Sequence, residues 1–212
     1  MKKVTIKDGE CQITEKKSRF IGEIKKVSGP EEAMAFVEAA KKKYFDAKHH
    51  CFAYVCGPDG KQERYSDDGE PSGTAGQPLL TILKAGDITD SVLIVTRYFG
   101  GVLLGPGGLA RAYSAAGEAA INSAEFAGLA TGIEAVVSFP FKDESAVRRL
   151  CANLTECGAA LEIRNVEYSD ECSMNIVCQK EFYEAFVKKV TDTLAGCVTV
   201  DKKDETTMLI KE

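Results

Sequence analysis

The chain has 212 residues, of which 44% are hydrophobic, and a formal net charge of −5. This length and apolar content allow two cores of roughly 100 residues each, so we expect two domains. No apolar run approaches the roughly 20 residues that span a bilayer, and residues begin to alternate soon after Met1, so we expect an unexported cytoplasmic protein with no membrane contact.

The charge is distributed unevenly along the chain. Residues 1–132 carry 17 basic and 17 acidic side chains, while residues 133–212 carry 10 and 15. Neither part is a polycation, which argues against sequence-independent binding to nucleic acid, and nothing indicates DNA-specific recognition. Any contact with RNA must therefore depend on a local group of basic side chains.

The eight cysteines include no CxxC pair, so reduced thiols are expected rather than disulfides. Cys172 and Cys178 would lie on one face of a strand as small core residues. His49, His50 and Cys51 are adjacent rather than spaced as metal ligands usually are. We expect neither a structural metal nor a cofactor.

The first part of the chain alternates in the way that strands do. Apolar residues alternate in three short stretches, at Val4 and Ile6, at Cys11 and Ile13, and from Phe20 to Ile24, which predicts a meander of strands. Pro30 and the acidic residues after it predict a helix to about Tyr44, whose final lysines complement the helix dipole. Residues 51–56 predict a further strand.

Residues 66–78, SDDGEPSGTAGQP, form a long loop of turn-forming residues, and such loops are often functional. Thr74 and Gln77 have the spacing of a capping box, which predicts that the loop leads into a helix ending at Gly86. The acidic side chains of this loop could hold Mg²⁺, supply a base, pair with Arg97, or simply be solvated. The candidate functional residues of the loop are Asp67, Asp68, Glu70 and Thr74.

A buried strand over residues 92–95 is followed by a glycine-rich loop and a helix predicted from Leu109 to Ser123. This order can present free backbone N–H groups to an anion. Arg111 would then lie in the first turn, where the helix dipole disfavours a cation, and a nearby anion would offset that mismatch. Gly105 and Gly107 match a relaxed dinucleotide fingerprint, but no βαβ unit is completed, so we reject that interpretation.

Small residues and glycines mark residues 124–132 as the boundary between two domains, residues 1–128 and 129–212. After it, a strand is predicted from Ile133, and the remaining pattern has the order βαββαβ. That order is typical of a ferredoxin-like domain, so the fold class is α+β.

Several unusual motifs occur together in the N-terminal part. They are Lys17-Ser18-Arg19-Phe20, His49-His50-Cys51-Phe52-Ala53-Tyr54, the run from Asp67 to Gly76, Thr96-Arg97-Tyr98-Phe99-Gly100-Gly101, and Gly107-Gly108-Leu109 with Arg111-Ala112-Tyr113. In this order they closely resemble the YigZ/IMPACT family over most of residues 15–125.

This resemblance implies an N-terminal domain of the ribosomal-protein S5 domain 2-like type and a C-terminal domain similar to the last domain of elongation factor G. Both relatives are ribosome-associated, and eukaryotic members of the family regulate translation under amino-acid starvation, largely through an additional N-terminal domain. The resemblance implies no catalytic residues.

We therefore expect a translation-linked protein that binds RNA or a ribosomal component rather than a catalyst. Single-stranded bases could stack on Tyr98 or Tyr113 while basic groups contact phosphates. Two alternatives are an enzyme acting on a small anionic or phosphorylated substrate and a module that binds only protein. The candidate residues for RNA or anion binding are Arg97, Arg111, Gly100, Gly101, Gly107, Gly108, Arg64, Lys48, His49 and His50.

Overall fold

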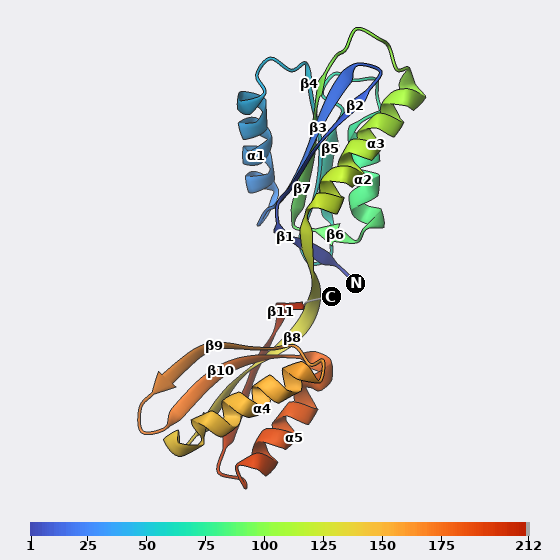
Figure 1. The fold of residues 1–212 in the computed structure, drawn as a ribbon. Coiled ribbons are helices and arrows are strands. Elements are labelled where there is room, and N and C mark those ends of the chain that lie inside the picture. The colour runs from blue at the N-terminus through green and yellow to red at the C-terminus, as the bar shows by residue number, and fades with distance from the viewer. Residues whose placement is uncertain (211–212) are drawn as a thin grey trace. The chain divides into compact units, whose positions relative to one another are not determined.

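The structure, a computed structural model, describes residues 1–210. The chain forms two compact units, one ending at Gly128 and the other beginning at Leu129 (Figure 1). Each unit combines antiparallel strands with helices, and the fold is of the α+β class, as the sequence predicts.

A five-stranded antiparallel sheet forms the centre of the N-terminal unit, in the order β2-β3-β7-β4-β5. Helix α1 (Pro30–Lys43) covers one face, and helices α2 (Gly76–Ala85) and α3 (Pro106–Ser123) cover the other (Figure 1). The strands are β2 Gly9–Glu15, β3 Ser18–Lys26, β4 His49–Cys56, β5 Gln62–Ser66 and β7 Ser91–Tyr98.

The central strands β4 and β7 are apolar on both faces because helices cover both faces of the sheet. Phe52 and Ile94 pack into the core beneath α1, while Cys51 and Val95 pack into the core beneath α2 and α3. Burial on both faces explains why these strands read as continuous apolar runs. The strand predicted over residues 92–95 is the middle of β7.

Two helix starts differ from the sequence prediction. Thr74 does not cap α2, because its hydroxyl donates to the carbonyl of Pro71 at 2.6 Å and the N-cap residue Ala75 makes no side-chain bond. Helix α3 begins at Pro106 rather than at Leu109, since proline suits the first position of a helix. Arg111 therefore lies beyond the first turn of α3. The prediction that its charge opposes the helix dipole there is wrong.

Shorter strands complete the N-terminal unit. Strand β1 (Lys3–Lys7) pairs in parallel with β6 (Ile88–Thr89) and antiparallel with the first residues of β8 (Glu125–Phe139). The sequence pattern predicted neither β5, whose residues are largely exposed and polar, nor β6, which has two residues.

Strand β8 begins earlier than the predicted start at Ile133. The glycines in its first half interrupt the alternation of apolar and polar residues by which a strand is predicted. Packing requires one of these glycines. A Cβ atom at Gly132 would lie 2.5 Å from Cγ1 of Val177, a distance that real Cβ atoms do not adopt. Residues 124–132, chosen as a boundary because they are small and rich in glycine, are thus mostly strand.

The C-terminal unit follows the predicted order βαββαβ. Its sheet has the order β9-β10-β8-β11, and α4 and α5 pack together with it around one core (Figure 1). Cys172 and Cys178 are buried on the core face of β10, as predicted. The elements after β8 are α4 Glu144–Glu156, β9 Leu161–Tyr168, β10 Cys172–Gln179, α5 Tyr183–Thr193 and β11 Thr199–Ile210, with single 3-10 turns at Phe141–Asp143 and Lys180–Phe182.

All eight cysteines lie within the described residues and are free thiols. Cys157 and Cys197 are exposed, Cys11 is half-buried, and the remaining thiols are buried. Burial raises the pKa of Cys56 to about 11, and it raises the pKa of Cys151 to the same value. These buried thiols act as small apolar core residues.

Candidate functional site

A pocket of about 360 Å³ opens at the end of the N-terminal unit where β4 begins and β7 ends. His49 pairs in register with Arg97, so the two side chains project from the same face of the sheet. The acidic loop, which we define as residues 67–75, and the glycine loop, residues 99–105, supply much of the remaining wall. The lining residues are Lys48, His49, Glu70, Pro71, Arg97, Phe99, Leu103, Leu104, Gly105, Pro106 and Leu109.

A buried ion pair lies at this pocket. Nη1 of Arg97 donates to Oε1 of Glu70 at 2.6 Å, and the two side chains are only 6% and 4% exposed. The Tyr113 hydroxyl donates to the same carboxylate oxygen at 2.9 Å. A buried pair with further hydrogen bonds is stable as a unit, while removal of one member leaves a charge without a partner. Arg97 is thus first a structural residue, which also lines the pocket.

The surroundings of Tyr113 keep its hydroxyl protonated. Burial, together with the Cys51 thiol and the Glu70 carboxylate, raises the pKa of Tyr113 well above its ordinary value. The tyrosine is completely buried, so the expectation that bases stack on its ring is wrong. Its ring instead packs edge-on against Phe20, with centroids 5.2 Å apart.

The two adjacent histidines have different environments because successive strand residues face opposite sides. His49 borders the pocket, and its Nδ1 lies 2.8 Å from the carbonyl oxygen of Asp68, so that nitrogen must carry the proton. His50 is buried, with Nε2 3.1 Å from the carbonyl of Tyr44. It does not line the pocket.

The acidic loop is held by its own carboxylates. Oδ1 of Asp67 accepts from the backbone N–H groups of Ala75 and Gly76, at 2.9 and 2.8 Å, and its Oδ2 accepts from Gly73. Asp67 therefore supplies the cap of α2 that Thr74 was expected to supply. Oδ2 of Asp68 accepts from the backbone N–H of His50 at 2.6 Å. Both carboxylates thus bind backbone N–H groups of the protein itself.

The glycine loop joins β7 to α3 and is attached to Ser18, the first residue of β3, next to the β2–β3 turn of Lys16 and Lys17. The backbone N–H of Gly100 donates to Oγ of Ser18 at 3.2 Å, and Nη2 of Arg97 lies 3.3 Å from the same oxygen. Gly101 and Gly105 have φ values of +83° and +71°, which favour glycine.

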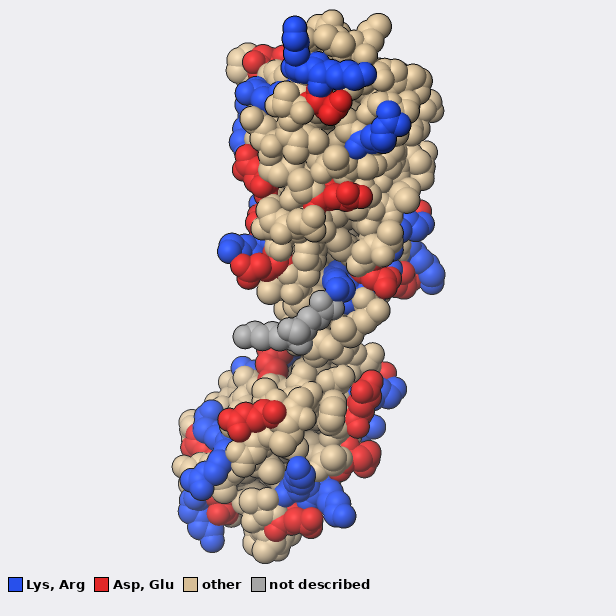
Figure 2. Space-filling model, turned by 45° about the vertical axis from the view of Figure 1, so that its right-hand side comes forward, with Lys and Arg blue, Asp and Glu red and all other residues tan. Residues whose placement is uncertain are grey.

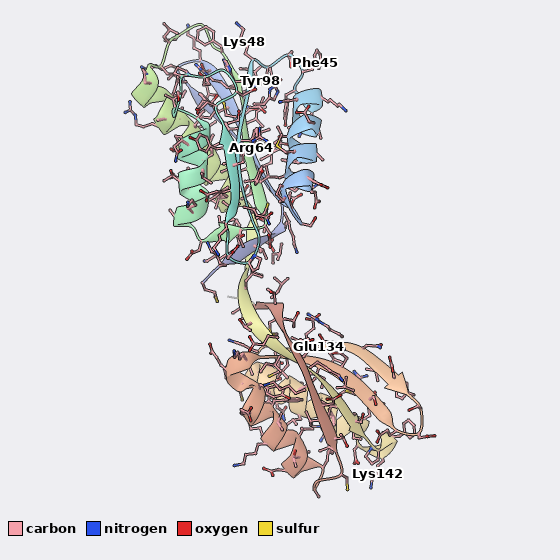
Figure 3. All side chains as sticks on the ribbon, turned by 180° about the vertical axis from the view of Figure 1, so that it is seen from behind. Phe45, Lys48, Arg64, Tyr98, Glu134 and Lys142 are labelled. Carbon is pink, nitrogen blue, oxygen red and sulfur yellow. The ribbon has the colours of Figure 1, made fainter. Side chains whose placement is uncertain are left out.

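The same loop exposes apolar side chains beside the pocket. Phe99 is 45% exposed and Leu103 is 84% exposed. Arg19 lies over the neighbouring Tyr98 ring, 4.2 Å from its centroid, and the Tyr98 hydroxyl donates to Asp46. Figure 3 shows Phe45, Lys48 and Tyr98 at this end of the unit. The end thus combines aromatic, aliphatic and cationic side chains.

Gly107 and Gly108 lie in the first turn of α3, where no side chain caps the helix. The guanidinium of Arg111 lies beside this turn, 3.7 Å from where a Cβ atom at Gly107 would be. Arg111 does not line the pocket. Arg64 lies part-way along β5, away from Lys48 (Figure 3). Of the basic residues predicted for the site, the pocket therefore brings together Lys48, His49 and Arg97.

Comparison with known proteins covers this same part of the chain. The family model of the Impact N-terminal domain matches residues 16–121, a segment that includes every pocket-lining residue. The chain belongs to the IMPACT family.

Two family members are close in sequence. The IMPACT family member YvyE of Bacillus subtilis is 49% identical over 110 residues, which are 51% of this chain and 51% of that protein. The IMPACT family member YigZ of Escherichia coli is 50% identical over 100 residues, covering 46% of this chain and 49% of that protein. In both cases the match spans about half the length of the relative.

A crystal structure described as that of a hypothetical protein resembles the whole chain. It has a TM-score of 0.59 and 29% identity, and the match covers 96% of this chain and 98% of that one.

Among the described residues of this IMPACT-family chain, no helix is long and apolar enough to cross a membrane.

Sequence reasoning missed the apolar part of the site. Pro71, Leu103 and Leu104 line the pocket but are not among the predicted site residues, which are mostly charged residues and glycines. A usable signal was present: Phe99, Val102 and Leu103 are large apolar residues in a loop, where polar residues are more usual.

Proposed function

We propose that this IMPACT-family chain is a cytoplasmic, translation-linked binding protein whose pocket contacts single-stranded RNA or a ribosomal component. The observation that carries the proposal is the pocket itself, which combines Lys48 and His49 with exposed Phe99 and Leu103, beside the Arg97–Glu70 pair. Proteins that bind single-stranded RNA use this combination: bases stack on aromatic rings while cations contact phosphates.

The distribution of charge supports a local contact. The chain has a net charge of −5, so it has no general attraction for a polyanion. Lys and Arg side chains nevertheless gather at the end of the N-terminal unit that is uppermost in Figure 2. This is the end where the β2–β3 turn and the glycine loop lie in Figure 1.

Family membership supports the link to translation, since the resemblance implies a role in translational regulation. We also propose that residues 1–128 are the Impact-type domain of the S5 domain 2-like type and that residues 129–212 are a ferredoxin-like domain similar to the last domain of elongation factor G. The observed βαββαβ order favours the second assignment.

The experiment that tests the function is sedimentation of lysate with the tagged full chain in a sucrose gradient, with and without ribonuclease. We expect the protein to travel with ribosomal particles and to lose that position when Lys48→Ala and Phe99→Ala are combined. Arg97→Ala is unsuitable for this test, because it would leave Glu70 buried without its partner.

Lys61→Ala is the matched control, since Lys61 is 83% exposed and does not line the pocket. Migration as a free small protein at low and moderate salt would contradict the proposal. A complex that survives ribonuclease and contains only protein would support the protein-binding alternative instead.

A further inference from the structure

The β2–β3 turn consists of two lysines in an unfavourable backbone conformation. Glu15 pairs with Ser18, so Lys16 and Lys17 alone form the turn, with φ values of +44° and +67°. Two-residue hairpins with two positive φ values strongly prefer Asn-Gly, because a Cβ atom crowds the backbone in the left-handed region. Lysine at both positions therefore destabilises the hairpin relative to that preferred pair.

The two lysines make no ion pair that would offset this cost. Both are exposed, and neither forms a salt bridge with an acidic group among residues 1–210. Their ammonium groups therefore remain available to a ligand in solution. Residues that oppose local structural preferences without an evident gain for the fold are characteristic of functional sites.

The turn is physically connected to the pocket. A Cβ atom at Gly100 would lie 2.0 Å from the carbonyl carbon of Lys17, so the glycine loop and the turn touch backbone to backbone. The next residue, Ser18, contacts both Gly100 and Arg97. A ligand that occupies the pocket and extends past the glycine loop would therefore meet the two lysines.

We propose that Lys16 and Lys17 bind backbone phosphates of a single-stranded RNA whose neighbouring nucleotide occupies the pocket. The inference rests on the proposed function and adds a second contact region to it. Lysine ammonium groups are suited to phosphates as mobile point charges, and a two-residue turn holds two of them close together. Arg19, stacked on Tyr98, provides a further cation nearby.

The test is the double substitution Lys16→Asn/Lys17→Gly in the full chain, because it removes both charges and restores the preferred turn sequence. Binding of a fluorescently labelled, mixed-sequence, twelve-nucleotide single-stranded RNA is measured by anisotropy across a series of salt concentrations. We expect affinity at 0.1 M salt to fall on the order of tenfold and the slope of log K against log salt to decrease in magnitude by about 1.4, since each phosphate contact on a single strand contributes about 0.7.

Stability should move in the opposite direction. The melting temperature of the same variant should rise by about 2–4 °C, so weaker binding could not be attributed to a damaged fold. The control Lys188→Gln/Lys189→Gln removes two exposed charges from α5 and should change neither the RNA affinity nor the salt slope.

The outcomes separate this inference from the proposed function. If the turn variant binds RNA with unchanged affinity and slope while Lys48→Ala/Phe99→Ala weakens binding, the inference is wrong and the proposed function stands. If the unaltered protein binds no RNA, the inference is wrong, and the proposed function stands only if the protein still travels with ribosomal particles in the gradient. If the turn variant keeps its RNA affinity but no longer comigrates with ribosomes, the lysines contact an acidic protein surface and the inference is wrong. A lower melting temperature of the turn variant would contradict the argument that the two lysines destabilise the hairpin.

Discussion

The acidic loop and the glycine loop lie at the same pocket and are both rich in turn-forming residues, yet they are held in different ways. The acidic loop is fixed by its own side chains, with Asp67 accepting three backbone N–H groups and Glu70 paired with Arg97. The glycine loop is attached through Gly100 and exposes Phe99 and Leu103. Polar side chains in one loop maintain the fold, while apolar side chains in the other remain available for a partner.

The largest effect should come from breaking the ion pair of the acidic loop. Glu70→Ala leaves the buried Arg97 guanidinium without its carboxylate, so we expect a loss of about 3–5 kcal/mol in the free energy of unfolding, measured with urea. Replacement of both members, Glu70→Leu/Arg97→Met, should cost less than Glu70→Ala alone. A loss below about 1 kcal/mol in the single variant would show that the pair is not structural.

The next effect concerns Gly100, where the glycine loop packs tightly against the backbone of Lys17. Gly100→Ala places a Cβ atom against the backbone of Lys17, and we expect a loss of about 2–3 kcal/mol in urea unfolding. Gly107→Ala is the matched comparison, because its Cβ atom would meet only Nη1 of Arg111, at 3.7 Å. It should be neutral or stabilising by up to about 1 kcal/mol. Equal losses in both variants would contradict the packing argument.

A smaller effect is expected from the cap of α2. Asp67→Ala removes the acceptor of three backbone N–H groups and should lower the free energy of unfolding by about 2 kcal/mol. Asp67→Asn keeps one carbonyl oxygen as an acceptor, so its stability should lie between that of the alanine variant and the unaltered protein. Thermal and urea unfolding should give the same order.

The smallest effect on stability should occur in the exposed part of the glycine loop. Leu103→Ser changes a side chain that is 84% exposed, so the free energy of unfolding should stay within about 0.5 kcal/mol. Binding to the twelve-nucleotide RNA should nevertheless weaken. Lower stability together with unchanged RNA binding would reverse the distinction between the two loops.

Much of the fold could be predicted from the sequence because its signals are local. Pro30 begins α1, the apolar runs of β4 and β7 report burial on both faces, and the βαββαβ order of the second unit follows from its periodicity. Strand β5 escaped prediction because an exposed edge strand needs no apolar alternation.

The site was less predictable because its contacts join residues that are distant in sequence. Arg97 had three possible acidic partners, and only the antiparallel register beside His49 places it against Glu70. The cap of α2 comes from Asp67, which lies eight and nine residues before the N–H groups of Ala75 and Gly76, whereas capping patterns consider only close neighbours. Sequence did identify Lys48, His49 and Arg97, whose motifs lie at the two strand ends that meet at the pocket.

The placement of the cysteines provides a natural labelling scheme. Both exposed thiols, Cys157 and Cys197, belong to the C-terminal unit. Cys51, in the N-terminal unit, is buried, and burial raises the pKa of its thiol. A maleimide dye applied to the native protein near neutral pH should react with the exposed pair first, because thiol reactivity requires both access and a thiolate. The pocket could then be studied with fluorescence and without any substitution, since the dyes would lie outside the unit that carries it.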